Sequence, residues 1–180
     1  DEIKREMARR APNGGEFSTP RKEGDEVEIV SGYFDGKTTG TPLCGIIRNT
    51  NTRSKDYSMF KEVFRPGHSD YGYFLKCGGN NDYRGGGHSS GRLTAPIVFC
   101  GAICKQLLKE KGVKVGSHIM SIADIKDDEF GVDIDGDKLE NLTKEVFPLL
   151  DKNKFESMRK IIADARNEGD SVGGTIECAV

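Results

Sequence analysis

The chain has 180 residues, with 27 lysines and arginines against 29 aspartates and glutamates, a net charge of −2 and a pI near 6.0. This length can bury the core of one domain, and the acidic balance argues against a nucleic-acid-binding protein, which is usually basic. No run of 18 apolar residues and no signal-peptide pattern occurs, so the sequence predicts a cytoplasmic protein that does not contact membranes.

The first third of the chain predicts a short helix and a hairpin. Residues 2–10 are charged and favour a helix, and residues 11–25 form a polar loop rich in glycine and proline. Residues 27–34 alternate as a strand, Asp35-Gly36 is a hairpin turn signal, and residues 42–49 form the return strand. Ser54 predicts the N-cap of a short helix that reaches Val63.

Residues 94–111 form the clearest predicted helix, with Thr94 as N-cap and Gly112 at its end. Its middle is apolar nearly all round, so we expect burial on most faces. The five cysteines include no C-x-x-C pair, and Cys100 and Cys104 are expected to be small buried hydrophobes in a reducing compartment.

The last third predicts a strand over 113–125, helices over 139–147 and 155–167, and a final strand over 172–180. Asp135-Gly136 is expected to be a turn with a capped helix, because its glycine comes too early for a calcium loop. Hairpins mixed with helices indicate the α+β class.

Residues 64–95 are rich in glycine, histidine, arginine and serine and contain almost no aliphatic side chain. Such a segment orders many torsions without burying apolar surface, so it predicts a ligand-binding loop that orders on binding. It leads into a helix N-terminus, where anions are favoured. The backbone N–H groups of Gly85–Ser90 predict a phosphate cradle, although the stretch matches neither G-x-G-x-x-G nor a Walker A loop. A flexible linker is the alternative.

Two charged residues stand out within this segment. His68 follows Pro66-Gly67 on a turn, and Asp70 is placed to orient its ring; a surface turn histidine is the alternative. Arg92 lies near a helix N-terminus, which is mildly unfavourable for a cation, so an anion is expected nearby; a solvated arginine is the alternative.

Several segments resemble, in order, those of the chorismate synthase family. RPGHSDY and DYRGGGHSSGRLTA carry the resemblance, together with RRAPNGG and the SGYFDGKTTGTP run upstream and GDSVGG downstream. The resemblance covers essentially the whole chain and implies a layered sandwich of antiparallel sheets and helices. It also implies that residues 1–180 are one partial domain, an internal segment between an upstream GESHG motif and a downstream half that carries much of the flavin site.

The family is a carbon–oxygen lyase acting on phosphates. It eliminates phosphate from C3 and a proton from C6 of 5-enolpyruvylshikimate 3-phosphate in an anti-1,4 sense to give chorismate, the last common step of aromatic amino acid biosynthesis. The resemblance implies a requirement for reduced FMN without net redox change, NADPH as a candidate reductant, and a homotetramer. The 180 residues alone are expected to be inactive.

The resemblance also implies site residues. His68 aligns with a histidine that protonates the reduced flavin, and the family's FMN-contacting R-S-S triplet corresponds to His88, Ser89 and Ser90. The anion-rich substrate needs several guanidiniums, for which the candidates are Arg10, Arg65 and Arg92. Glu16 and Ile97 stand where the family often has arginine, which alters part of the expected pocket.

Two rival functions come from other classes. One is a non-catalytic phosphate- or nucleotide-binding module, and the other is an RNA-binding domain built on Arg84-Gly85-Gly86. No metal is expected, since His68, Cys77 and His88 do not have the spacing or number of a structural zinc site.

Overall fold

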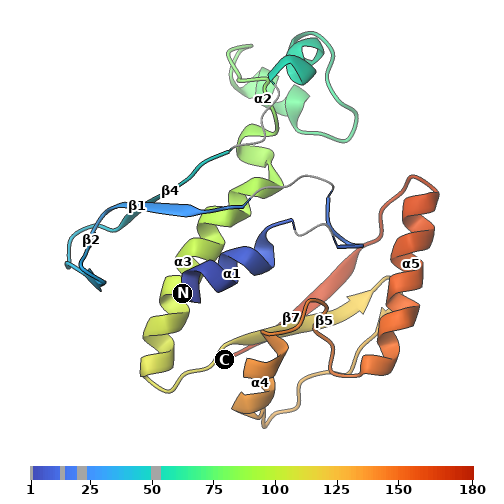
Figure 1. The fold of residues 1–180 in the computed structure, drawn as a ribbon. Helices are drawn as coiled ribbons and strands as arrows, with labels where there is room; N and C mark the ends of the chain where they lie inside the picture. Colours follow the sequence, from blue (N-terminus) through green and yellow to red (C-terminus); the bar gives the residue numbers. More distant parts are fainter. Residues whose placement is uncertain (1, 13–14, 20–23, 50–53) are drawn as a thin grey trace. The chain divides into compact units, whose positions relative to one another are not determined.

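The structure, a computed structural model, describes residues 2–12, 15–19, 24–49 and 54–180. Two compact units, residues 1–103 and 104–180, divide the chain. Helices and small antiparallel sheets occur in both units (Figure 1), as expected for the α+β class. Along the described ranges, no helix is long and apolar enough to cross a membrane.

The first unit is built on α1 (Glu2–Arg10), a pair of two-stranded sheets and the start of α3 (Thr94–Glu110). β1 (Val27–Ser31) pairs antiparallel with β4 (Cys44–Ile47), and β2 (Tyr33–Phe34) pairs with β3 (Lys37–Thr38). Asp35 and Gly36 turn the chain between β2 and β3 with φ of +46° and +79°, as the hairpin signal predicts.

The core of this unit forms where α1, α3 and the β1–β4 sheet meet. Met7, Ala95 and Phe99 are buried there, with apolar side chains of both strands packed against them. A Cβ on Gly45 would lie 2.6 Å from the ring of Phe99, so β4 approaches α3 this closely only because residue 45 is glycine.

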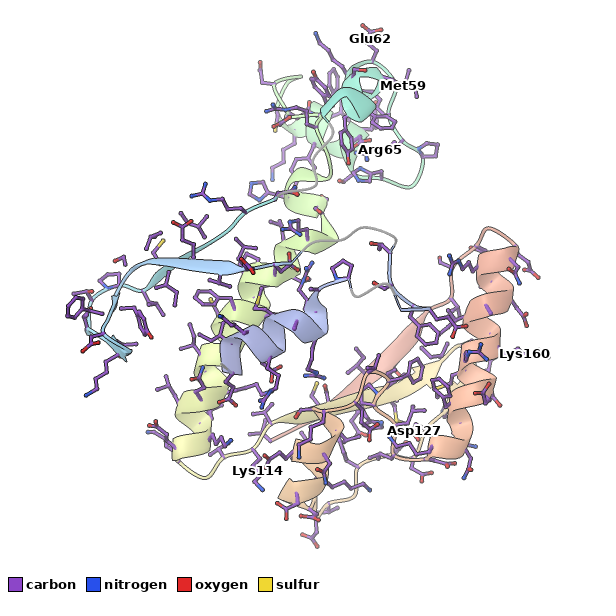
Figure 2. All side chains as sticks on the ribbon, in the orientation of Figure 1. Met59, Glu62, Arg65, Lys114, Asp127 and Lys160 are labelled. Carbon is purple, nitrogen blue, oxygen red and sulfur yellow. The ribbon has the colours of Figure 1, made fainter. Side chains whose placement is uncertain are left out.

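Residues 54–93 of the same unit fold into short helical pieces joined by turns. They are η1 (Ser54–Lys61), α2 (Asp70–Lys76), η2 (Gly87–Ser89) and η3 (Gly91–Leu93). Aromatic rings hold them together, because the ring of Phe64 lies 5.3 Å from Tyr71 and 5.1 Å from Phe74. Arg65 follows η1, the helix that carries the exposed Met59 (Figure 2).

The second unit is a three-stranded antiparallel sheet with two helices packed on its central strand. The strand order is β6 (Ile125–Lys126), β5 (Gly116–Ile122), β7 (Gly174–Ala179). α4 (Gly136–Leu142) and α5 (Phe155–Asn167) contact β5, while η4 (Lys152–Lys154) leads into α5. Leu139, Leu149 and Met158 are buried in this unit.

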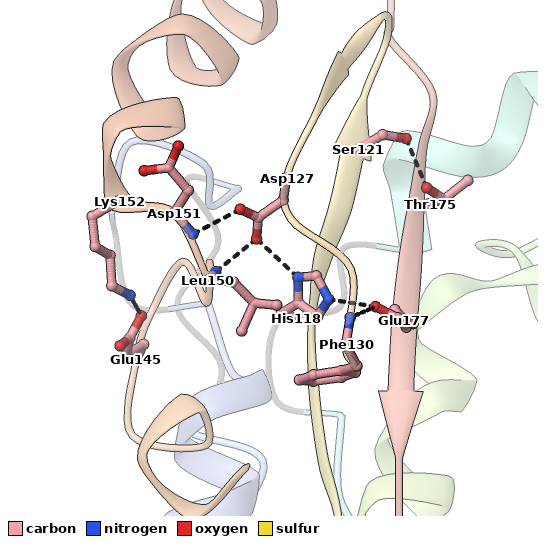
Figure 3. Close-up of polar contacts among 10 residues, drawn as sticks. All are labelled: His118, Ser121, Asp127, Phe130, Glu145, Leu150, Asp151, Lys152, Thr175 and Glu177. Carbon is pink, nitrogen blue, oxygen red and sulfur yellow. Dashed lines mark hydrogen bonds and ion pairs between the residues drawn. The ribbon is translucent and has the colours of Figure 1, made fainter. Parts of the chain in front are cut away.

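A buried histidine joins two strands and a loop in this sheet (Figure 3). His118 on β5 is 1% exposed; its Nδ1 lies 2.9 Å from Asp127 and its Nε2 lies 2.9 Å from Glu177 on β7. Burial disfavours the charged form of Asp127, but hydrogen bonds from the N–H groups of Asp151 and Leu150 outweigh it and lower the pKa of this carboxyl. A hydrogen bond from His118 likewise lowers the pKa of Glu177.

Three sequence expectations about the helices need correction. α3 is buried on one face only, with Ile97 69% and Leu107 58% exposed, because the structure packs partners against just one side of it. All five cysteines are exposed, Cys100 and Cys104 included. Thr94 is not an N-cap: it is helical, and its hydroxyl donates to the carbonyl of Gly91.

The remaining corrections concern boundaries. The predicted strand 113–125 begins at Gly116 and is interrupted before β6, and the predicted helix 139–147 is α4, which begins at Gly136 and ends at Leu142. Asp135 caps that helix by accepting a hydrogen bond from the N–H of Asp137. The piece that starts at Ser54 is a 3₁₀ helix and ends at Lys61.

Candidate active site

Asp70, at the start of α2, holds Arg65 in a two-pronged ion pair. Nε and Nη2 of Arg65 each donate to a different carboxylate oxygen at 2.7 Å, and the backbone N–H of Arg65 adds a bond of 3.2 Å. These bonds lower the pKa of Asp70 to about 2 and raise the pKa of Arg65. The guanidinium also lies 4.5 Å from the ring centre of Phe60, so its plane is fixed on several sides.

The same carboxylate holds His68. Nδ1 of His68 lies 2.6 Å from Oδ1 of Asp70, and the turn before it uses Gly67 with φ of +68°. The two atoms lie within ion-pair distance, but Nδ1 makes no hydrogen bond to any described residue, so the carboxylate acts on the ring through proximity and charge. The expected Asp70–His68 pairing is therefore present, and Arg65 belongs to the same cluster.

A cavity of about 230 Å³ lies beside this cluster. Asp70 and Tyr73 of α2 line one part of it, and the glycine-rich stretch lines another with Gly85, Gly86, Gly87 and His88. Nη2 of Arg65 donates to the carbonyl of Gly85 at 2.9 Å, which ties the glycine stretch to the Arg65–Asp70 pair.

The glycine stretch is a pair of tight turns. Gly85 and Gly87 have φ of +75° and +50°, and a Cβ on Gly86 would lie 2.9 Å from the Cα of Ser90. Glycines at these places leave backbone N–H groups open to a ligand at the cavity, as a phosphate cradle requires. Ser89 does not line the cavity and is exposed, whereas the Ser90 hydroxyl accepts a hydrogen bond from the N–H of Arg92.

A second cluster joins the two other predicted arginines. Asp25, which is 2% exposed, forms an ion pair with Nη1 of Arg10, and its Oδ1 lies 2.8 Å from Nη1 of Arg92. Arg92 also donates to the carbonyl of Arg48 at 3.1 Å. Burial and the neighbouring charge of Arg10 lower the pKa of Arg92. The solvated-arginine interpretation of Arg92 is therefore wrong, and the anion beside it within this chain is Asp25.

Two further arginines, Arg9 and Arg84, have partners close by in the sequence. Arg9 pairs with Glu6 at 3.1 Å and Arg84 with Asp82 at 2.8 Å; the latter pair lowers the pKa of Asp82 to about 2. Across the described residues, no three metal-ligating side chains come together.

Sequence reasoning missed two residues, Asp25 and His118. An aspartate between a glycine and a strand is ordinary in a polar loop, and nothing near it in the sequence marks it as buried. A single histidine among the alternating residues of a strand also gives no signal, because Glu177 lies 59 residues further along the chain.

These features define a class: an α+β protein in which a glycine-rich loop lines a cavity beside a histidine–aspartate pair, and in which aspartates hold arginines in two clusters. Comparison with known proteins gives the family. A sequence model of chorismate synthase matches residues 1–180. The chain belongs to the chorismate synthase family.

Individual relatives agree. The chain is 50% identical over 172 residues to a chorismate synthase of Sulfurimonas denitrificans, covering 96% of this chain and 46% of that protein. It is 45% identical over 177 residues to a chorismate synthase of Methanobrevibacter smithii, and the match covers 98% of this chain and 48% of that protein. A crystal structure of a chorismate synthase superposes with a TM-score of 0.69 at 27% identity, over 98% of this chain and 47% of that one. The chain thus spans about half the length of the relatives it matches, and the expected chorismate synthase-like α+β fold is confirmed.

Proposed function

We propose that the protein containing this chain is a chorismate synthase, a carbon–oxygen lyase that converts 5-enolpyruvylshikimate 3-phosphate to chorismate and phosphate. The observation that carries the proposal is the fold of residues 64–95, the segment with the strongest family resemblance. In a chain that belongs to the family, this segment places a carboxylate-bound histidine beside a glycine-lined cavity.

The proposed roles follow from the geometry. His68 acts as the acid, and the carboxylate of Asp70, 2.6 Å from its Nδ1, favours the protonated ring that can give up a proton. Arg65, Arg10 and Arg92 bind the phosphate and carboxylates of the substrate. Each is anchored by a carboxylate that keeps the guanidinium in place before the ligand arrives.

Reduced FMN is the proposed cofactor, held in part by His88, Ser89 and Ser90. The cavity fits its phosphate end, because the three glycines at 85–87 present backbone rather than side chains to the ligand. When bound, reduced FMN supplies electron density transiently to the elimination, without net redox change. The exposed side chain of His88 contributes its imidazole ring to the proposed flavin site, and Ser90 contributes the backbone turn against which Gly86 packs.

The family resemblance also supports a homotetramer in the cytoplasm, with NADPH as the reductant that regenerates reduced FMN. Sedimentation of the full-length protein tests the assembly, with a tetramer expected. Anaerobic mixing with NADPH and FMN tests the reductant, with bleaching of the flavin absorbance expected.

A flavin titration separates this proposal from the rival phosphate-binding module. The full-length protein, titrated with FMN in the presence of 5-enolpyruvylshikimate 3-phosphate, should quench the flavin fluorescence in a saturable way that depends on the substrate. A phosphate-binding module would bind inorganic phosphate but would leave the flavin signal unchanged.

A further inference from the structure

Asp25 occupies an unusual place for an aspartate. It lies two residues before β1, its side chain is fully buried, and its φ is +46°. A buried carboxylate is costly unless it is paired, and a left-handed backbone is uncommon for a residue other than glycine. Such an outlier indicates a position that the surrounding structure requires.

The carboxylate lies between two guanidiniums from distant parts of the chain. One oxygen pairs with Arg10, the last residue of α1, and the other lies 2.8 Å from Arg92, in the turn that precedes α3. Two guanidiniums so close together repel each other, and the carboxylate between them offsets that repulsion. Both arginine side chains are about one-fifth exposed, so neither is sealed in the interior.

Each arginine has a second anchor that sets its orientation. Nε of Arg10 donates to the hydroxyl of Thr94 at 3.2 Å, and Nη2 of Arg92 donates to the carbonyl of Arg48 at 3.1 Å. The contact between Arg92 and Asp25 is an ion-pair contact without a hydrogen bond, so the carbonyl of Arg48 sets the orientation of Arg92 while Asp25 supplies the charge. Both guanidiniums are thus held before any ligand binds, and this preorganisation is what an anion clamp needs.

The cluster is also joined to the proposed flavin loop. The Ser90 hydroxyl, at the end of that loop, accepts the backbone N–H of Arg92 at 3.2 Å. One residue, Arg92, is therefore positioned by its backbone through the loop and by its side chain through Asp25.

We propose that Asp25 is a positioning residue that holds Arg10 and Arg92 together as a clamp for an anionic group of the substrate. The inference rests on the proposed function and extends it to a residue outside the expected site. The competing interpretation is that Asp25 only ties α1 to the start of α3.

The test uses Asp25→Asn and Asp25→Glu in the full-length enzyme, assayed with pre-reduced FMN. Asparagine tolerates the left-handed backbone but loses the charge and turns an amide N–H₂ toward an arginine. We expect KM for 5-enolpyruvylshikimate 3-phosphate to rise about 10- to 100-fold, with kcat within about threefold of wild type. Glutamate keeps the charge but displaces it by one methylene, so KM should rise by a smaller factor, about threefold or more.

Glu28→Gln is the matched control. Glu28 also pairs with an arginine of the first unit, Arg48 at 3.1 Å, but both side chains are more than half exposed. This variant should keep the wild-type KM and kcat.

A purely structural role would lower the amount of folded enzyme, and with it the apparent kcat, while KM stayed unchanged. Unchanged KM in the folded Asp25→Asn variant therefore overturns the inference. If that variant does not fold, unchanged KM in Asp25→Glu overturns it. If the wild-type enzyme is active and the variants keep its KM, only the role of Asp25 is refuted. If the wild-type enzyme forms no chorismate, the proposed function is refuted as well.

Discussion

Two carboxylates, Asp70 and Asp25, organise the polar residues of the first unit. Asp70 was recognisable from the sequence as a partner of His68, because the two are separated by one residue on a Pro-Gly turn. Its ion pair with Arg65 could not be predicted, since the two hydrogen bonds of that pair depend on how the chain folds back at α2. Asp25 could not have been predicted at all, because Arg92, one of its partners, lies far away in the sequence.

The role of His68 gives the first prediction. Replacing His68 with alanine in the full-length enzyme removes the proposed acid, so turnover with pre-reduced FMN should fall about 10²-fold or more. Glu62→Gln, an exposed change in the turn after η1, is the control and should leave turnover unaltered. Unchanged turnover of a folded His68→Ala protein would remove His68 from the mechanism.

Acid should weaken the Arg65–Asp70 pair in a defined window. The hydrogen bond from Arg65 lowers the pKa of Asp70 from 3.8 to about 2. A carboxyl whose pKa is lower in the folded state stabilises the fold above its unfolded pKa and loses that contribution as pH falls through its folded pKa. The difference in unfolding free energy between wild type and Asp70→Asn should therefore be constant from pH 7 to about 5 and shrink below about 4. Urea unfolding across this range measures it, and a difference that did not change with pH would contradict the assignment.

At the scale of elements, sequence patterns located most helices and strands but not their surroundings. α1 and α5 have the predicted bounds, because the signals are local: a run of charged residues for α1, and an apolar stripe followed by Gly169 for α5. The burial of α3 was predicted wrongly for a physical reason. A helix that is apolar on all sides can be buried on all sides. Which sides are buried depends on the elements that pack against the helix, and the sequence of the helix does not give these.

The glycine turns of the cavity give a prediction about flavin binding. A methyl group at residue 86 would meet Ser90 at 2.9 Å, so Gly86→Ala should displace the turn and weaken FMN binding by about tenfold. Gly91→Ala is the matched control, because no atom lies within 4 Å of the Cβ that it adds. Fluorescence titration of the full-length variants measures both, and equal FMN affinities would exclude the turn from the flavin site.

The second unit offers a stability prediction at the β5–β7 pair. His118→Ala removes the donor to the buried Asp127 and should cost about 3 kcal/mol or more of unfolding free energy. Ser121→Ala removes a 2.7 Å hydrogen bond between the hydroxyls of Ser121 and Thr175 across the same two strands. This change should lower the unfolding free energy by only about 1 kcal/mol. Chemical denaturation of the two variants gives the comparison; equal costs would mean that the His118 bridge adds nothing beyond an ordinary side-chain hydrogen bond.

At the scale of the whole molecule, the match to chorismate synthases covers this chain almost completely but only about half of each relative. The resemblance of several segments, RPGHSDY and DYRGGGHSSGRLTA among them, was enough to suggest the family, whereas the glycine-rich composition of residues 64–95 by itself left a ligand-binding loop and a flexible linker open. The complete pocket could not be derived from these 180 residues, because they correspond to only about half the length of each relative. We therefore expect the 180 residues alone to be inactive.

The most direct measurement is chorismate formation by the full-length protein and by residues 1–180, each mixed anaerobically with reduced FMN and 5-enolpyruvylshikimate 3-phosphate. The full-length protein should form chorismate and phosphate in equal amounts, and should stop when FMN is omitted, whereas the 180-residue chain should form neither. Full-length protein that binds both ligands yet forms no chorismate would contradict the proposed function.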